Sequence, residues 1–162
     1  MRNSLFTMTN IIGRPRLYKF LFNSISTIPS KKGGMIQSWL LPCLQQKICG
    51  GLWNKECVIK GIYNYNFKDR IDILGVFPNF KVIIEIDTSR ADQVGKKMLS
   101  RISAYSDEPI IYLAICYMGT KKMSLGECEK YFYYGKHLIE RLQNGSFFLG
   151  VFLLPNKIQI IY

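Results

Sequence analysis

The sequence predicts a mixed α/β domain in which helices flank a central sheet. The chain has 162 residues, of which 48% are hydrophobic and 20% charged, so it is long and apolar enough to form one folded domain. Segments with strand patterns alternate with segments of helical periodicity, in the order helix, three strands, helix, strand, helix, two strands. This order predicts a mixed sheet covered by helices.

The first elements follow a break at Pro29 through Gly34, where two glycines form a hinge. We therefore expect a basic N-terminal extension over residues 1–34 and a single α/β domain over 35–162. Apolar residues then recur at helical spacing from Ile36 to Ile48, and Gly50-Gly51 ends that helix. The β-rich segment Cys57 to Tyr65 is the first predicted strand.

Two strands, Arg70 to Val76 and Phe80 to Ile86, flank the turn signal Phe77-Pro78-Asn79. This spacing predicts an antiparallel hairpin. A helix over Ser89 to Ala104 follows, with an apolar stripe formed by Ala91, Val94, Met98 and Ile102. The remaining predicted elements are a buried strand at Pro109–Tyr117, a helix at Leu125–Gln143, and strands at Phe147–Leu154 and Lys157–Tyr162.

The charge of the chain is strongly positive and unevenly distributed. The formal net charge is +11 and the sequence pI is about 9.5, yet no acidic residue precedes Glu56. A basic excess of this kind favours a polyanionic partner, either nucleic acid or an anionic membrane surface. The alternative is a solvated basic tail. No apolar run is long enough to span a membrane.

The cysteines and the single histidine exclude several kinds of site. Five cysteines are present and no two have C-x-x-C spacing, which favours reduced thiols in the cytoplasm over disulfides or structural zinc. Because His137 is the only histidine, a histidine-based zinc site or a Ser-His-Asp triad is disfavoured. No phosphate-binding glycine motif is present, which disfavours ATP-driven and dinucleotide chemistry.

Acidic residues inside apolar strands are the main functional signal. Asp72 and Glu85 each stand between two isoleucines, and burying such a charge is costly unless it is paired or binds a metal. Glu85 and Asp87 share one face of their strand, and Asp72 can join them across the hairpin. Oxygen ligands of this kind suit Mg²⁺ or Mn²⁺.

The following helix offers counter-charges to these acids. A helical wheel places Arg90, Lys97 and Arg101 along one flank of the apolar stripe, with Lys96 and Asp92 on the other. Simpler roles remain open for each residue. Asp72 could form a structural ion pair with Arg70 or Arg90, Asp87 could favour the helix N-terminus, and Lys97 could be an ordinary snorkelling lysine.

The strand order and the acid positions resemble the PD-(D/E)XK nuclease superfamily, the restriction-endonuclease-like fold, from about Met35 to Tyr117. The first acid of that family lies on the second core strand, where Ile71-Asp72 stands, and its acid-x-Lys motif matches Glu85-Ile86-Asp87. The chain departs from the family in having Ile71 for the motif proline and Asp87 for the motif lysine. Some members take the catalytic lysine from the next helix. In this sequence, Lys97 is the first candidate for that role and Lys96 is the second.

The resemblance implies metal-dependent hydrolysis of phosphodiester bonds in nucleic acid. We expect that nucleic acid to be DNA rather than RNA. The implied catalytic residues are Asp72, Glu85 and Lys97, and the implied Mg²⁺ or Mn²⁺ ligands are Asp72, Glu85 and Asp87. Implied nucleic-acid-binding residues are Arg90, Gln93, Lys96 and Arg101, of which Gln93 resembles a helix glutamine of some subfamilies. A small chain of this kind is also expected to use a homodimer or a partner subunit.

Two other interpretations compete with the nuclease. The first is a catalytically degenerate relative that keeps the fold and binds nucleic acid or a protein, as the missing lysine at position 87 indicates. The second is an unrelated interaction module in which the aromatic run Tyr131–Tyr134 forms a contact surface, although such a run is more often half core and half surface. A membrane-surface role for the basic N-terminus is a weaker third interpretation.

Overall fold

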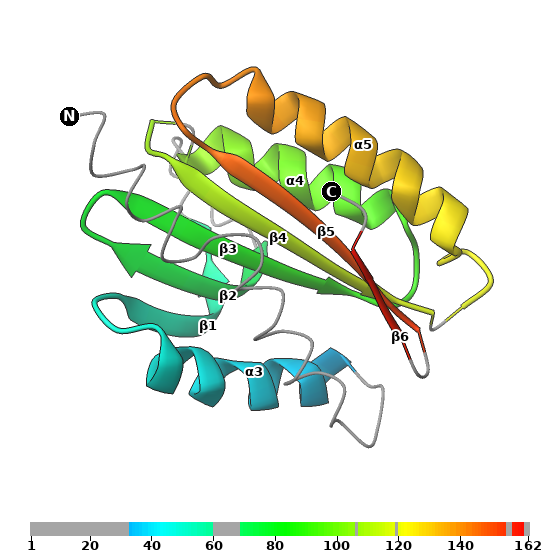
Figure 1. The fold of residues 1–162 in the computed structure, drawn as a ribbon, viewed down its shortest axis with the longest axis horizontal. Helices are drawn as coiled ribbons and strands as arrows, with labels where there is room; N and C mark the ends of the chain where they lie inside the picture. Colours follow the sequence, from blue (N-terminus) through cyan, green and yellow to red (C-terminus); the bar gives the residue numbers. More distant parts are fainter. Residues whose placement is uncertain (1–32, 60–68, 106, 119, 155–156, 161–162) are drawn as a thin grey trace.

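The computed structural model describes residues 33–59, 69–105, 107–118, 120–154 and 157–160, and it confirms a mixed sheet flanked by helices (Figure 1). Its helices are α3 (Gly33–Lys47), α4 (Asp92–Tyr105) and α5 (Leu125–Glu140). Its strands are β1 (Leu52–Val58), β2 (Arg70–Phe77), β3 (Phe80–Asp87), β4 (Ile110–Tyr117), β5 (Phe147–Leu154) and β6 (Lys157–Ile160). The predicted order of elements is therefore the observed order.

The strands form one six-stranded sheet in the order β1-β2-β3-β4-β5-β6. Strands β1, β2 and β3 run antiparallel to one another, and the predicted hairpin closes with Phe77 opposite Phe80. Strands β3, β4 and β5 are parallel, because α4 and α5 carry the chain back between them. Strand β6 then pairs antiparallel with β5. The centre of the sheet is parallel and both of its edges are antiparallel.

Helices cover both faces of the sheet and enclose two separate cores (Figure 1). On one face, Ile36, Leu40 and Leu44 of α3 pack against the sheet at helical spacing. On the other face, α4 and α5 bury the predicted stripe of α4 together with Phe132 of α5. Strands β3, β4 and β5 are buried on both faces, which explains their nearly continuous apolar sequences.

Several boundaries differ from the sequence prediction by a few residues, and α5 ends at Glu140 rather than at Gln143. The first strand begins at Leu52 and not at Cys57, because it is an edge strand in which only Trp53 is fully buried, so no clear alternation marks it. Residues 60–68, where the predicted strand continued, lie outside the described part of the chain. Helix α4 begins at Asp92, three residues after the predicted start at Ser89. Most of the predicted extension over residues 1–34 also lies outside the described residues, and α3 begins at Gly33.

The five cysteines are all within the described residues and all have free thiols. Cys116 and Cys128 are buried in the core on the α4–α5 face, as expected of reduced thiols among apolar neighbours. Among the helices of the described ranges, none combines the length and the apolar character that crossing a membrane requires.

Candidate active site

The three predicted acids converge where β2 and β3 separate. The pairing between β2 and β3 ends at Ile73 and Ile84. Past this pair of residues the two strands diverge, and β2 pairs only with β1 while β3 pairs only with β4. We call this place the strand fork. Asp72 precedes the fork on β2, and Glu85 and Asp87 follow it on β3. The alternation of side chains brings all three carboxyl groups to the sheet face that α4 covers.

The side chain of Asp72 fills the strand fork. Its Oδ2 accepts a hydrogen bond of 2.7 Å from the backbone N–H of Ile86, so a carboxylate replaces the missing strand partner. Its carbonyl oxygen accepts a 2.6 Å hydrogen bond from Nε2 of Gln37 in α3, which also donates to Glu56 of β1. Glu56 adopts a left-handed backbone conformation with φ of 53°. Asp72 therefore has a structural role in addition to its position in the site.

Lys97 of α4 places its ammonium group among the three acids. Its Nζ lies 2.9 Å from Asp87 Oδ1, 3.0 Å from Glu85 Oε2 and 3.4 Å from Asp72 Oδ2. The Lys97 side chain is 24% exposed, whereas the Glu85 side chain is only 1% exposed. The ammonium group of Lys97 therefore lies among the acids and remains accessible from solvent.

Arg101, one helical turn after Lys97, is completely buried beneath the strand fork. Its Nε donates a 2.6 Å hydrogen bond to Glu85 Oε1, and its two terminal nitrogens donate to the carboxylate of Asp69 and to the carbonyl oxygen of Arg70. One guanidinium therefore joins the start of β2 to the end of β3 across the fork. This geometry uses the planar, multiply donating group that distinguishes arginine from lysine.

The site contains more negative than positive groups. We call the following set the acidic cluster: Asp69, Asp72, Glu85 and Asp87 with the cations Lys97 and Arg101. When all six are ionised, four carboxylates against two cations leave two negative charges. The buried Asp87 Oδ2 accepts no hydrogen bond, whereas the buried Glu85 Oε2 has the Lys97 ammonium group 3.0 Å away. A buried carboxylate oxygen without a partner is costly unless a further cation or donor reaches it.

Burial and charge shift the pKa values of this cluster in opposite directions. Burial raises the pKa of Glu85 to about 8, although the positive charges of Lys97 and Arg101 lower it in part. Burial likewise raises the pKa of Asp87. Burial alone would lower the pKa of Lys97, but the charges of Glu85, Asp87 and Asp72 outweigh it and raise this pKa above its ordinary value. Lys97 therefore carries a positive charge at neutral pH.

Two of the predicted nucleic-acid-binding residues lie away from the acidic cluster. Arg90 precedes α4 and forms a bidentate ion pair with Asp92, so the helical wheel assigned it to the wrong flank. Lys96 also pairs with Asp92, 3.3 Å away, on the flank that the wheel predicted. Lys97 is thus the helix lysine that meets the acids, and Lys96 is not.

The other two predicted nucleic-acid-binding residues lie nearer. Gln93 is half-buried one turn before Lys97, on the same side of α4. Arg101 was predicted to bind backbone phosphates, but its complete burial prevents any contact with a strand at the surface. The prediction for Arg101 is therefore corrected to an internal ion pair, which positions Glu85.

Sequence reasoning missed Asp69 and Ser100. Asp69 accepts hydrogen bonds from Arg101 and, at 2.7 Å, from the hydroxyl of Ser100. Asp69 precedes β2 outside any apolar run, so it did not stand out as an acid in a strand. The sequence contained one signal for Asp69, which lies in the neighbouring helix. Ser100 and Arg101 are consecutive hydrogen-bond donors, and both need an acceptor on the strand that faces the helix.

The chemistry of the donors fits a hard divalent cation. Asp72, Glu85 and Asp87 supply only carboxylate oxygens, and one of these, the buried Asp87 Oδ2, has no hydrogen-bond donor. Within the described ranges, no three His, Cys, Asp or Glu side chains are already arranged as a metal site. The ammonium group of Lys97 stands among the three carboxylates, so metal ligation requires this side chain to shift toward solvent.

The fold and the cluster together define a class: a mixed α/β protein with an acidic, lysine-containing site at a fork in its sheet. Comparison with protein-family models, with curated proteins and with solved structures finds no match to the chain. The assignment of a function therefore depends on the chemistry of the site.

Proposed function

We propose that this protein is a metal-dependent nuclease that hydrolyses phosphodiester bonds of nucleic acid, and we expect that nucleic acid to be DNA rather than RNA. The observation that carries this proposal is the convergence of Asp72, Glu85 and Asp87 on the ammonium group of Lys97. The resemblance to PD-(D/E)XK nucleases gives the same three acids and the same lysine. The net charge of +11 supports a polyanionic substrate.

Each residue of the site has a defined task in the proposed reaction. Asp72, Glu85 and Asp87 would hold Mg²⁺ or Mn²⁺, which supplies a Lewis acid and lowers the pKa of a bound water. Lys97 donates to an oxygen of the scissile phosphate and offsets the negative charge that develops there. Arg101 fixes the carboxylate of Glu85 through its 2.6 Å hydrogen bond, which makes it a positioning residue.

The test is cleavage of labelled single- and double-stranded DNA and RNA with Mg²⁺, Mn²⁺ or EDTA. We expect metal-dependent cleavage, a loss of at least about a hundredfold in Lys97→Met, and a similar loss in Asp87→Asn. Both substitutions approximately conserve side-chain volume. Circular dichroism checks that each variant is folded.

Matched controls separate the site from general charge effects. Lys55→Met removes a cation from exposed β1, and Glu127→Gln neutralises an exposed acid of α5, so both should retain activity. If Lys97→Met cleaves as fast as Lys55→Met, Lys97 is not catalytic. Absence of cleavage by the wild-type protein with either metal refutes the nuclease proposal.

The second candidate is a catalytically degenerate nuclease fold that binds nucleic acid or a protein. It is favoured by Lys97, which pairs with all three acids at 3.4 Å or less and so partly neutralises them without a metal. In this case the protein binds nucleic acid equally well with EDTA and with Mg²⁺, and cleaves under neither condition. We further propose that the protein acts in the reducing cytoplasm, where its free thiols persist.

A further inference from the structure

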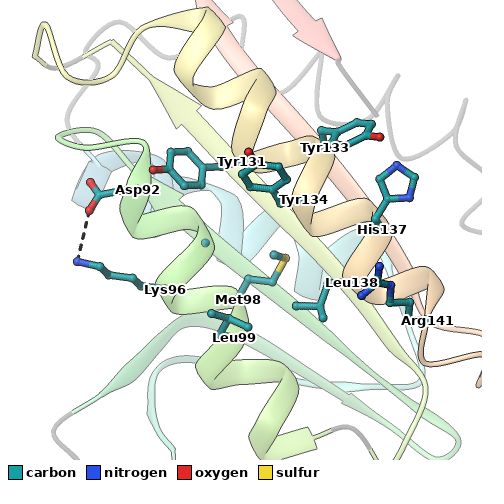
Figure 2. A pocket seen from close by; sticks show the side chains of 11 residues that line it. Asp92, Lys96, Met98, Leu99, Tyr131, Tyr133, Tyr134, His137, Leu138 and Arg141 are labelled. Atoms are coloured by element: carbon teal, nitrogen blue, oxygen red, sulfur yellow. Dashed lines mark ion pairs between the residues drawn. The ribbon is translucent and has the colours of Figure 1, made fainter.

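A pocket of about 800 Å³ lies between α4 and α5, on the side of α4 away from the acidic cluster (Figure 2). Met98 and Leu99 of α4 and Leu138 of α5 form its apolar middle. Tyr131 and Tyr134 extend over it from α5. Pockets of this size accommodate small ligands or a few units of a polymer.

The aromatic run over residues 131–134 divides between core and surface. Phe132 is fully buried, whereas Tyr134 is 54% exposed and Tyr133 is 49% exposed. The Tyr131 and Tyr134 rings meet edge to face, with centroids 6.1 Å apart. The Tyr131 ring is half-buried with the Lys130 ammonium group 4.9 Å from its centroid, whereas the Tyr134 ring is exposed. An exposed tyrosine ring that lines a pocket is suited to stack against planar groups, which burial in a core would prevent.

Positive groups lie at both ends of the pocket. Figure 2 shows Lys96 and Asp92 at one end and Arg141 at the other. The single lining acid, Asp92, is already neutralised by Arg90 at 2.8 Å and Lys96 at 3.3 Å. The charged side chains that line the pocket, Lys96, Arg141 and Asp92, leave one net positive charge around an apolar, aromatic middle. This pattern of charge is complementary to an anionic ligand with aromatic groups.

We propose that the α4–α5 pocket binds single-stranded nucleic acid. The bases stack on Tyr131 and Tyr134, and the phosphates contact Lys96 and Arg141. Aromatic platforms between cationic groups are the usual means of binding single strands without reading sequence. A pocket of about 800 Å³ between two helices admits unstacked bases but not a duplex. A protein partner fits less well, because it would have to supply the matching negative charge.

This proposal deepens the proposed function, since it rests on nucleic acid being the substrate. Neighbouring lysines of α4 face the two sites: Lys97 contacts the acidic cluster, and Lys96 lines the pocket. A strand held in the pocket therefore lies one helix width from the proposed active site. The pocket would favour substrates that contain a single-stranded segment.

The test is fluorescence anisotropy of the full-length protein with a short fluorescein-labelled oligothymidylate in EDTA, so that no cleavage occurs. We expect Tyr134→Ala to weaken binding about tenfold and Tyr134→Phe to retain wild-type affinity, because phenylalanine keeps the ring. Arg141→Gln should weaken binding and reduce the slope of log affinity against log salt by about 0.7. Lys55→Gln, which loses the same charge at exposed β1, should bind as the wild type does.

The outcomes separate this proposal from the nuclease proposal. The pocket assignment is overturned if Tyr134→Ala binds as tightly as the wild type does. It is also overturned if Lys55→Gln loses as much affinity as Arg141→Gln. Both conclusions hold even if cleavage is observed. Pocket-dependent binding without any cleavage leaves the assignment intact and refutes only hydrolysis. Sedimentation velocity of wild type and Tyr134→Ala tests the rival occupant: a dimer that the substitution abolishes assigns the pocket to a second copy and overturns the proposal.

Discussion

Replacing Arg101 with methionine should be the most destabilising single change in the site. The guanidinium is completely buried and donates to Glu85, Asp69 and the carbonyl oxygen of Arg70. Asp69 is half-exposed, so water can replace that bond, but Glu85 has no such access. Removing one partner of a buried ion pair costs about 3–5 kcal/mol. Because Lys97 still contacts Glu85, we expect about 3 kcal/mol for Arg101→Met.

A double-mutant cycle with Glu85→Gln isolates the ion pair from the other contacts of Arg101. If the pair contributes as its geometry indicates, the double variant loses less free energy of unfolding than the two single variants lose together, by about 1–3 kcal/mol. Urea denaturation followed by circular dichroism gives the free energies of unfolding. A loss below about 1 kcal/mol in Arg101→Met, or strictly additive losses, would refute the reasoning.

The loss in Arg101→Met should also depend on pH. Burial already raises the pKa of Glu85 to about 8, and removing Arg101 takes away a charge that lowers it. A carboxyl group whose pKa is raised by folding contributes stability below its unfolded pKa of 4.5, and this stability is lost as pH rises through the folded value. The variant should therefore be more destabilised at about pH 9 than at about pH 5. If the loss of stability in Arg101→Met is the same at both pH values, the expected direction of the pH dependence is wrong.

Three further predictions concern single positions. Partial burial raises the pKa of Asp69, but hydrogen bonds from Arg101 and Ser100 outweigh it and lower this pKa. Stability is therefore lost as pH falls below about 4, and Asp69→Asn should flatten that loss in thermal melts. Gly150→Ala should cost about 1–3 kcal/mol in urea denaturation, because a Cβ there overlaps an aromatic ring, whereas Gly126→Ala meets nothing. Asp72→Ala should cost about 1–3 kcal/mol by leaving a backbone N–H unpaired, while Asp72→Asn keeps an acceptor and should lose less.

The central strands and the acids could be predicted from sequence because burial leaves a strong pattern. Glu85 is the lone charge in a run of β-branched residues, and its position on β3 follows from the alternation of side chains. Lys97 was identified because its helical phase is fixed by the apolar stripe beside it. These inferences required only local periodicity and the hairpin turn.

The rest depended on contacts that periodicity does not contain. A helical wheel gives the direction in which Arg101 leaves α4 but not whether its long side chain ends inside or outside, and an acceptor 16 residues away decides that. Asp69 is part of the site only because the Arg101 side chain points into the protein, where it donates a hydrogen bond to the Asp69 carboxylate. The edge strand β1 was misplaced because Trp53 is its one fully buried residue, so the sequence around it reads as surface.

The hydrogen bond from the Ile86 amide to Asp72 also makes the site observable without a substrate. In most of a sheet, an amide proton reports on a neighbouring backbone carbonyl, which does not change its charge. Here the acceptor is a side-chain carboxylate, 2.7 Å away, that also pairs with Lys97. The amide resonance of Ile86 in a ¹⁵N-labelled sample would therefore respond when a cation binds the Asp72 carboxylate. The fold thus provides a backbone probe in the Ile86 amide, through which titration of the site with Mg²⁺ can be followed directly.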